Sequence, residues 1–335
     1  MKTKGLFAFL PETQANRSSR VMLFAAVLLA AAFLYLAFRD LDWHVFFAAI
    51  KGAQYACLPL VLIWSSASFF TRAFRLRVLL ASDRHISMPG VFWANMAGYL
   101  GNSILPARAG ELARAAYLAR RSQVSMSFAL AAGLVERLVD LAALVVLGAI
   151  ALSSIGIIPP LFQQALNVIA IIGAAGLLLI FILPRLEKNI NRLILVFPLL
   201  KEGHRSKLNI ILGQFLSGLR SLHGFSRAAQ FTALTGLIWL MDAAGTVLLS
   251  HILKIPLSLQ QAFVLLAALG LSSAIPSTPG GVGIVQFVAV SVLAPFGISQ
   301  EDALAFIIIS QMLSYLIILF WGMLSLWQFN KRAQP

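Results

Sequence analysis

The chain has 335 residues, of which 60% are hydrophobic and only 11% are charged, whereas about a quarter of the residues in a soluble domain carry charge. This composition excludes an ordinary soluble enzyme and indicates an integral membrane protein. The single cysteine, Cys57, excludes an internal disulfide, and the five histidines lack the spacing of zinc ligands, so we expect no metal and no cofactor.

Six apolar runs are long enough to cross about 30 Å of hydrocarbon. They cover residues 21–38, 55–71, 127–152, 161–183, 228–252 and 303–327. The first run follows a basic segment at 1–20 but has no small-residue cleavage site after it, so we expect an uncleaved helix. Two further apolar stretches, at 89–105 and 260–296, are interrupted by Pro and Gly.

The excess of Lys and Arg, which gives a formal net charge of +14, lies between the spans. With the N-terminus in the cytosol, nearly all of these residues fall on the inner side. The exceptions are Arg39, Lys51 and Lys254 outside and Arg137 within a span. A bias of this kind sets the orientation of membrane proteins. We therefore expect cytosolic N- and C-termini, contact with anionic membrane lipids, and no binding of nucleic acid.

A short pattern occurs twice, as GNSILPARAGELARA at 101–115 and as LSSAIPSTPGGVGIV at 271–285. An offset of 170 residues aligns the Ser, Pro and Gly positions, which are Ser103 with Ser273, Pro106 with Pro276, and Gly110 with Gly280. Pro removes an amide donor and Gly admits backbone conformations that other residues avoid, so each copy predicts a helix break and a re-entrant hairpin. The alternative is a pair of Pro-kinked spanning helices.

The second half of the chain repeats the first half upside down. The broken segment starts inside in the first half, 21–152, and outside in the second half, 161–327. Inverted repeats with broken helices are typical of secondary transporters, whose site lies where the breaks meet. The sequence therefore predicts an all-α polytopic membrane protein with six transmembrane helices plus two re-entrant helical hairpins, arranged as an inverted-topology repeat.

This repeat also predicts how the chain is divided. We expect the two hairpins at about 89–120 and 260–296, with Pro106, Pro276 and Pro279 at their breaks. The connecting parts are a cytosolic N-terminus at 1–20, an external loop at 153–160, an amphipathic cytosolic linker at about 206–222 and a cytosolic tail at 328–335.

Ionisable residues within the spans are candidates for a functional site. The sequence GLVERLVD places Glu136 and Asp140 on one helix face and Arg137 three residues before Asp140. Such charges must face the protein interior or water. They form either a structural ion-pair cluster or a group that handles protons or lipid headgroups. Asp242, the only acid in its span, would pair with Arg108 or Arg137, or stay protonated.

The two predicted turns differ in chemistry. The first carries Arg108, Glu111 and Arg114, whereas the second is neutral, with Ser277, Thr278 and three glycines that include Gly280. The glycine-rich turn either presents backbone amides to a phosphate or permits close packing.

Three arginines at the end of the second span, Arg72, Arg75 and Arg77, are expected to form a cytosolic basic anchor. The alternative is that they receive a lipid phosphate, which the guanidinium group binds in a two-pronged fashion.

Three stretches, GYLGNSILPARAGELARAAYLARR, SFALAAGLVERLVDLAAL and SSAIPSTPGGVGIVQFVAV, resemble the transmembrane module of the bacterial lysylphosphatidylglycerol synthase and flippase family, over roughly 20–328. The resemblance implies lipid translocation in a bacterial inner membrane. It places six residues at the family's central cavity: Arg108, Gly110, Glu111, Glu136, Arg137 and Asp140. Bifunctional members carry an aminoacyltransferase domain after this module; we expect a stand-alone member without it, so no synthase activity is carried over.

These observations lead us to expect a transporter for an anionic phospholipid or a polyprenyl-phosphate-type lipid. Arg108 or Arg114 would neutralise the phosphate, while Glu136, Asp140 or Asp242 would balance charge or carry a coupling proton. An integral membrane enzyme acting on a lipid is the first alternative, but the acids are sparse and the histidines scattered for such chemistry. The second alternative is a non-transporting scaffold for envelope assembly.

Overall fold

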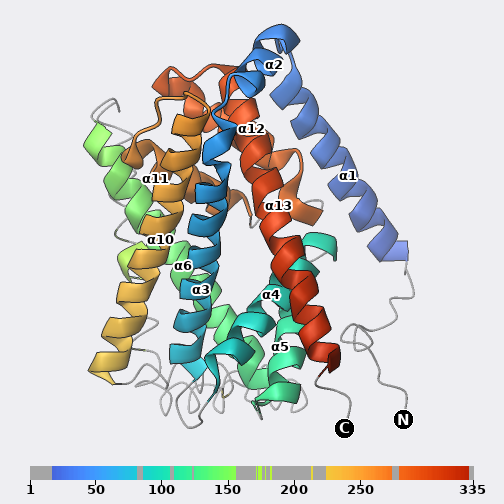
Figure 1. Ribbon diagram of the computed structural model, residues 1–335, viewed down its shortest axis with the longest axis vertical. Helices are drawn as coiled ribbons and strands as arrows, with labels where there is room; N and C mark the ends of the chain where they lie inside the picture. The colour runs from blue at the N-terminus through green and yellow to red at the C-terminus, as the bar shows by residue number, and fades with distance from the viewer. Residues whose placement is uncertain are drawn as a thin grey trace, which may run out of the picture.

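The protein is a bundle of helices in the computed structural model, which describes residues 17–80, 86–105, 109–122, 124–155, 171, 173–175, 178, 182, 213, 224–273 and 279–331 (Figure 1). These residues contain no strand, so the expected all-α class is confirmed for them. Most of the predicted span at 161–183 and of the predicted linker at 206–222 lies outside the described residues. The same is true of five positions in the predicted turns: Pro106, Arg108, Pro276, Ser277 and Thr278.

The helices fall into two groups along the chain. The first group is α1 (Arg17–Phe38), α2 (Trp43–Lys51), η2 (Tyr55–Cys57), α3 (Leu58–Leu80), α4 (Met88–Ile104), α5 (Gly110–Arg121) and α6 (Met126–Ile155). The second group is α10 (Phe225–Ile252), α11 (Leu259–Ser272), η5 (Pro279–Gly281), α12 (Ile284–Leu293), η6 (Ala294–Phe296) and α13 (Gln300–Lys331).

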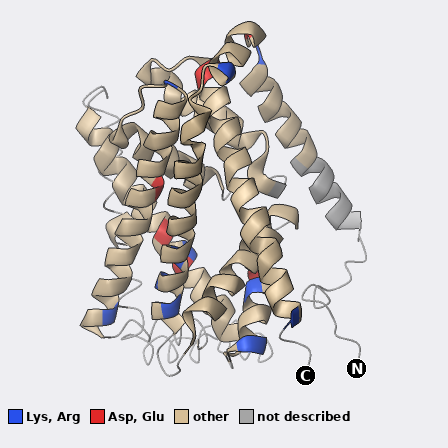
Figure 2. Ribbon diagram, in the orientation of Figure 1, with Lys and Arg blue, Asp and Glu red and all other residues tan. Residues whose placement is uncertain are grey.

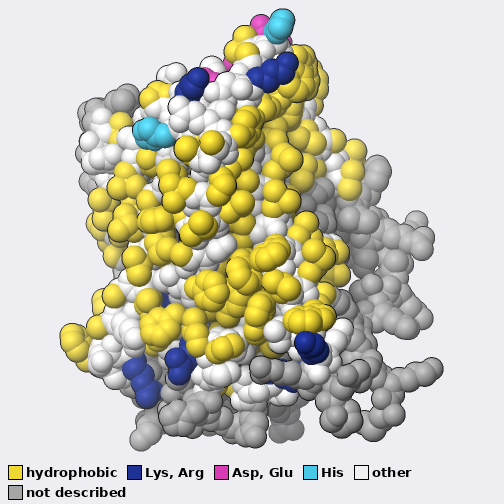
Figure 3. Space-filling model, in the orientation of Figure 1, with side chains coloured by type: hydrophobic (Ala, Val, Ile, Leu, Met, Phe, Trp, Pro, Cys, Tyr) yellow, Lys and Arg dark blue, Asp and Glu magenta, His cyan; other side chains and the backbone are white. Residues whose placement is uncertain are grey.

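Four helical segments are long and apolar enough to cross a membrane: Tyr55–Leu80, Met126–Ile155, Phe225–Ile252 and Gln300–Lys331. They contain four of the six predicted runs and extend beyond them. Shorter apolar helices lie at Val27–Phe38, Leu259–Ser272 and Ile284–Phe296. Apolar side chains cover the middle of the face in Figure 3, with Lys and Arg toward its two ends. The chain is a polytopic membrane protein.

The glycine-rich turn before α12 depends on backbone that other residues rarely adopt. Gly280, Gly281 and Gly283 have φ values of 75°, 68° and 93°. A Cβ on Gly283 would also overlap the backbone of Ala30 in α1. Conformation and close packing therefore account for these glycines, in agreement with the packing explanation of this turn.

Glycines also let α4 and α5 approach closely. A Cβ on Gly101 would lie 2.6 Å from the Cα of Gly110, and one on Gly98 would lie 2.9 Å from the Cβ of Arg114. A side chain at either α4 position would push α5 away. The small residues of the GNSILPARAG motif therefore hold two antiparallel helices side by side and place Arg114 against α4.

The two groups of helices have matching bounds. Adding 170 to the bounds of α3, α4, α5 and α6 gives numbers within a few residues of the bounds of α10, α11, α12 and α13. Their packing partners match as well: α3 packs against α10, α4 against α13, and α11 against α6. Each group thus packs the first of its two short helices against the last long helix of the other group, while the second, α5 or α12, packs against the last helix of its own group.

Residues 170 positions apart touch where α3 meets α10. The Thr71 hydroxyl lies 3.6 Å from the Met241 sulfur, and the next pair along, Arg72 and Asp242, forms an ion pair. The α3–α10 contact therefore joins the two groups of helices at positions 170 residues apart.

We expect Gly101→Leu to lower the free energy of unfolding by about 1–3 kcal/mol, because the new side chain must displace α5. Thermal unfolding of the purified protein in detergent measures the change. Gly236→Leu on α10 is the matched control, since nothing lies within 4 Å of a Cβ there. Equal unfolding temperatures for the two variants would contradict the close contact between α4 and α5.

Candidate functional site

Arg75 of α3 is the centre of a buried group of charges. Its side chain is only 2% exposed. Nη1 donates to Asp140 Oδ1 at 2.5 Å and to Thr235 Oγ1 at 3.1 Å, and Nη2 donates to Asp140 Oδ2 at 2.9 Å. The guanidinium group therefore binds both oxygens of the Asp140 carboxylate, a bidentate arrangement that is the strongest for this kind of pair.

Glu136 connects Arg75 to a second buried arginine. Its Oε1 lies 3.4 Å from Arg75 Nη2, and its Oε2 accepts from Arg114 Nη1 at 3.0 Å. Arg114 Nη2 lies 2.7 Å from Glu111 Oε2, and Nη1 also contacts Asn95 Oδ1 at 3.4 Å. Since Glu136 and Asp140 both bind Arg75, the prediction that they share a helix face is confirmed.

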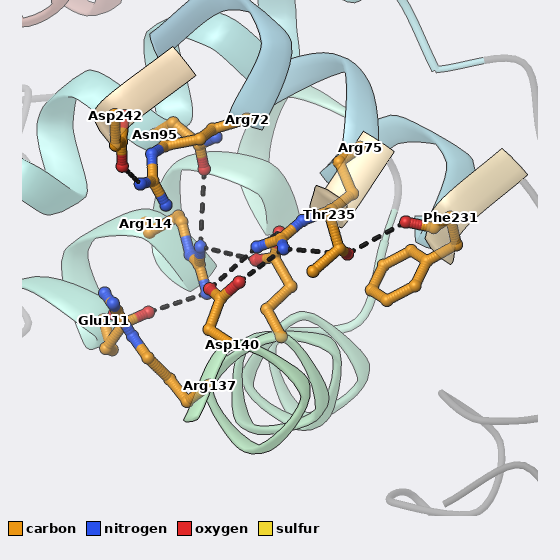
Figure 4. Close-up of polar contacts among 11 residues, drawn as sticks. Arg72, Arg75, Asn95, Glu111, Arg114, Arg137, Asp140, Phe231, Thr235 and Asp242 are labelled. Carbon is orange, nitrogen blue, oxygen red and sulfur yellow. Dashed lines mark hydrogen bonds and ion pairs between the residues drawn. The ribbon is translucent and has the colours of Figure 1, made fainter. Parts of the chain in front are cut away.

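Arg137 ends this chain of charges. Its Nη2 donates to Glu111 Oε1 at 2.8 Å, and its side chain is 40% exposed, unlike those of Arg75 and Arg114. Three arginines thus alternate with three carboxylates, in the order Asp140, Arg75, Glu136, Arg114, Glu111, Arg137 (Figure 4). We call this set the charge chain. Each buried charge has an opposite neighbour, as a charge in a membrane interior requires.

Asp242 of α10 binds Arg72 of α3, so the prediction that Arg108 or Arg137 is its partner is wrong for Arg137, which binds Glu111 instead. Arg108 lies outside the described residues. The Ser68 hydroxyl donates to Asp242 Oδ1 at 2.6 Å, and the Arg72 guanidinium lies 5.2 Å from the centre of the Trp239 ring. The physical reason is geometry: α3 and α10 pack face to face, which brings positions 72 and 242 together.

The expected role of Arg72, Arg75 and Arg77 as a cytosolic anchor is also wrong for the first two. Arg75 is buried among Asp140, Glu136 and Thr235, and Arg72 is largely buried against Asp242. Only Arg77 lies apart from these charges, and its Nε donates to the Ile86 carbonyl at 2.8 Å. The apolar run predicts a helix that ends at about residue 71, so the arginines after it are expected in the cytosol. The helix α3 instead continues to Leu80 and keeps Arg72 and Arg75 inside the bundle.

A cavity of about 560 Å³ opens beside these charges. Its wall carries two guanidinium groups, of Arg72 and Arg137, and two carboxylates, of Asp140 and Asp242. The wall is otherwise mostly apolar, with hydroxyl groups from α3, α4, α10 and α13 and large apolar side chains such as Leu249, Leu266 and Leu313. We call this space the central cavity. It can accept a ligand that is charged at one end and apolar at the other.

One donor on the cavity wall has no hydrogen-bond partner among the described residues. The Trp239 indole Nε1 is buried and unpaired, although Trp239 lines the cavity next to Arg72. Buried N–H groups are rarely left without an acceptor. An anionic group in the cavity could accept from this nitrogen and from Arg72 together.

The predicted glycines have packing roles and lie apart from the charges. Gly110 lies against the backbone of Gly98 and Asn102 in α4. The Gly280 carbonyl accepts from Gln311 Nε2 at 2.7 Å and from the Tyr315 hydroxyl at 3.3 Å. Pro279 begins η5. Six predicted charged residues are brought to one region: Glu111, Arg114, Glu136, Arg137, Asp140 and Asp242. Arg72 and Arg75 had been considered for a phosphate site only as the alternative to an anchor, and Asn95 and Thr235 were not predicted.

Metal ligands do not gather in the described part of the chain: no group of three or more His, Cys, Asp or Glu side chains there could hold an ion. Cys57 is exposed and free of a disulfide. Every carboxylate in the charge chain binds an arginine. A metal ion would therefore compete with arginine for the carboxylate oxygens.

Comparison with known proteins gives two matches. Residues 23–322 match the family model described as the lysylphosphatidylglycerol synthase TM region. The chain is also 28% identical over 226 residues to the UPF0104 membrane protein MJ1078 of Methanocaldococcus jannaschii, a match that covers 66% of this chain and 90% of that protein.

We expect Arg75→Ala to destabilise the protein by about 3–5 kcal/mol, because it leaves Asp140 and Glu136 buried without their cation. Unfolding in detergent, followed by loss of tryptophan fluorescence or by heat, measures the loss. Arg39→Ala is the control, since its pair with Asp40 is exposed and worth at most about 1 kcal/mol. A protein as stable with Arg75→Ala as with Arg39→Ala would show that the charge chain does not hold the bundle together.

Proposed function

Since the chain belongs to the lysylphosphatidylglycerol synthase TM region family, we propose that it is a lipid transporter that moves an anionic phospholipid or a polyprenyl-phosphate-type lipid across the membrane. The observation that carries this proposal is the central cavity, which places Arg72, Arg137, Asp140 and Asp242 among apolar side chains in a membrane protein. Charges in such a position mark a substrate or ion pathway. The site binds and releases its ligand without covalent chemistry.

Arg137 and Arg72 are the groups best placed to meet the phosphate of a headgroup. Both line the central cavity, and Arg137 is the most exposed member of the charge chain. Arg114 was a candidate from the sequence, but it is buried and its guanidinium is occupied by Glu111, Glu136 and Asn95. We therefore assign Arg114 the role of holding Glu111 and Glu136, so that Arg137 is presented to the cavity.

Asp140 and Asp242 supply the opposite charge on the same wall. A phosphate that binds Arg72 or Arg137 would draw that arginine away from its carboxylate. Without its cation, the carboxylate would bind a proton more readily. A proton gradient is therefore one candidate driving force. Asp242 is the stronger candidate of the two, because Asp140 is gripped by both prongs of the deeply buried Arg75.

The finer architecture that we propose is an inverted repeat of six spans and two re-entrant hairpins. Matching helix bounds and matching packing partners support it. Figure 1 shows the α4–α5 pair near the lower end of the bundle and α11 and α12 nearer the upper end. In transporters of this design, one repeat rocks against the other around a fixed site. The contact of Arg72 with Asp242 lies at the point about which the halves would move.

We propose that the protein lies in the inner membrane of a bacterium, with both termini in the cytosol. The described Lys and Arg residues on the ribbon gather mainly at the lower end, where α13 also ends (Figure 2). Positive residues favour the cytosolic side. Anionic lipid headgroups would be drawn to the same rim before they enter the cavity.

The first test of transport is a leaflet-resolved assay in liposomes with headgroup-labelled lipids, with and without a pH gradient. We expect Arg137→Gln to slow the movement of an anionic lipid by about ten- to a hundredfold, the loss of a charged hydrogen bond of about 1.5–3 kcal/mol. Arg39→Gln, at an exposed site, should leave the rate unchanged. Equal rates for the wild type and Arg137→Gln would remove Arg137 from the mechanism, and no movement of any lipid by folded wild-type protein would refute transport.

The second test exchanges the central pair. We expect Arg72→Asp and Asp242→Arg each to lower stability and transport, and the double variant Arg72→Asp/Asp242→Arg to recover much of both. The recovery would appear as a coupling energy of about 1–3 kcal/mol in a double-mutant cycle. The physical reason is that the two side chains meet across the α3–α10 contact, so exchanging their charges keeps the ion pair. Additive losses in the double variant would contradict this pairing.

A further inference from the structure

Tyr99 of α4 lines the central cavity together with Arg72 and Arg137. Its ring packs against that of Phe69, with ring centres 5.1 Å apart. Phe69 lies three residues before Arg72, about one turn of α3, so the phenol lies beside the turn that carries this arginine. Tyr99 is also within electrostatic reach of both guanidinium groups. It therefore shares one region of the cavity wall with both arginines.

The Tyr99 hydroxyl is an open donor. It makes no hydrogen bond to another described residue, and its oxygen is not among the described buried atoms that lack a partner. By contrast, the hydroxyls of Tyr55 and Tyr315 donate to the carbonyls of Ile50 and Gly280, at 2.6 and 3.3 Å. A hydroxyl on a cavity wall that is neither paired nor fully buried can be reached by a ligand.

The two cavity arginines also keep open donors. A guanidinium group carries five N–H donors. Among the described residues, Arg72 and Arg137 each use one nitrogen, Nη2, to bind a carboxylate. The buried Arg75 and Arg114 instead bind carboxylates through both of their Nη atoms. An anion can therefore meet Arg72 and Arg137 before either of their ion pairs opens.

We infer that Tyr99 is a ligand of the transported lipid, and that its hydroxyl donates to a phosphate which Arg72 and Arg137 bind through their open N–H groups. The inference rests on the proposed function. It adds a neutral donor from α4 to two cations, one from α3 and one from α6. The two unesterified oxygens of a phosphodiester have lone pairs enough to accept from all three side chains, and hydrogen bonds to such a charged acceptor are the strong ones.

The charge of the wall selects the kind of phosphate. Its two arginines, Arg72 and Arg137, are balanced by two carboxylates, Asp140 and Asp242. A phosphodiester brings one negative charge, whereas a phosphomonoester brings about 1.5 to 2 at neutral pH. A further charge without a cation is costly among apolar side chains. The site therefore fits the diester of a phospholipid better than the monoester of a polyprenyl phosphate.

The first experiment measures the binding of dihexanoyl phosphatidylmethanol, a soluble diester lipid, to the full-length protein in a neutral detergent by calorimetry. We expect Tyr99→Phe, which removes only the hydroxyl, to weaken binding about tenfold, or about 1.4 kcal/mol. Tyr35→Phe, at an exposed position of α1, should bind within about twofold of the wild type. Unchanged affinity in Tyr99→Phe, beside a clear loss in Arg137→Gln, would overturn the inference, and so would a folded wild type that does not bind.

Three further probes identify the group that is recognised. Dihexanoyl phosphatidic acid, the monoester with the same chains, should bind about tenfold more weakly than the diester at neutral pH. Dihexanoylglycerol has no phosphate, and its binding should not depend on Tyr99. Inorganic phosphate should bind more weakly than either phospholipid. A monoester that binds more tightly than the diester, or free phosphate that binds as tightly as the lipid, would contradict the assigned ligand.

The second experiment observes the hydroxyl in the unaltered protein by NMR. The chain has five tyrosines, so a ¹³C label at the ring carbon that carries the hydroxyl gives five signals. We expect phosphatidylmethanol to shift the Tyr99 signal and dihexanoylglycerol to leave it in place. Replacing the other four tyrosines by Phe, one at a time, identifies the Tyr99 signal by elimination, so the result does not require a Tyr99 variant to fold. A Tyr99 signal that stays in place with the diester bound would refute the contact.

The experiments separate this inference from the proposed function. If the wild type binds the diester and shifts the Tyr99 signal but moves no lipid, transport is refuted and the Tyr99 contact stands. If the wild type moves lipid, while Tyr99→Phe changes neither affinity nor rate, transport stands and the role of Tyr99 is refuted.

Discussion

Arginine buried among membrane-spanning helices is the constraint on which this structure depends. An isolated guanidinium in hydrocarbon is costly, so each buried arginine must bring a carboxylate with it. Arg75 brings Asp140 and Glu136, Arg114 brings Glu136 and Glu111, and these contacts join α3, α5 and α6. The charge chain thus decides which helices must lie together, because separating any of them would leave a buried charge alone.

Glycines in and just before the GNSILPARAG motif serve the same constraint. Gly98 and Gly101 allow α5 to lie against α4, and this places Arg114 between Asn95 and Glu136. Gly133 continues the arrangement in α6, since a Cβ there would overlap the Arg114 guanidinium. Glycines on two helices, α4 and α6, therefore leave the space that the buried Arg114 side chain fills.

Much of the fold follows from the sequence, because long apolar runs and Pro–Gly breaks are local signals. Four predicted runs became long apolar helices, and the two breaks separate α4 from α5 and α11 from α12. Helix ends were less predictable: α3 continues to Leu80 because Arg75 and Arg72 are neutralised by residues far away in the chain. A sequence shows that an arginine follows an apolar run. It does not show whether a carboxylate from another helix lies beside that arginine in the folded protein.

Most charged residues of the site were predicted, but Arg72 and Arg75 were expected mainly as a cytosolic anchor, for the same reason. Glu136, Arg137 and Asp140 lie in the middle of an apolar run, so their burial could be foreseen. Arg72 and Arg75 lie at the end of one, where cytosolic arginines are common. One signal could have found Arg72: it lies 170 positions before Asp242, the offset that relates the two Pro–Gly motifs. Thr235 and Asn95 offered no such signal, since single polar residues in apolar helices are frequent.

The two groups of helices have similar bounds but unlike chemistry. Positions 170 residues after Arg75, Arg114, Glu136 and Asp140 are occupied by Gly245, Ile284, Phe306 and Ser310, none of which carries charge. The six members of the charge chain therefore all lie in the first group of helices, and the second group contributes Asp242, which pairs with Arg72. If one half rocks against the other around the cavity, as we propose, the two halves present unlike surfaces to the ligand. The first half contributes Arg72, Arg137 and Asp140, and the second half contributes Asp242, hydroxyl groups and hydrocarbon. Such asymmetry would let one half hold a phosphate while the other half moves.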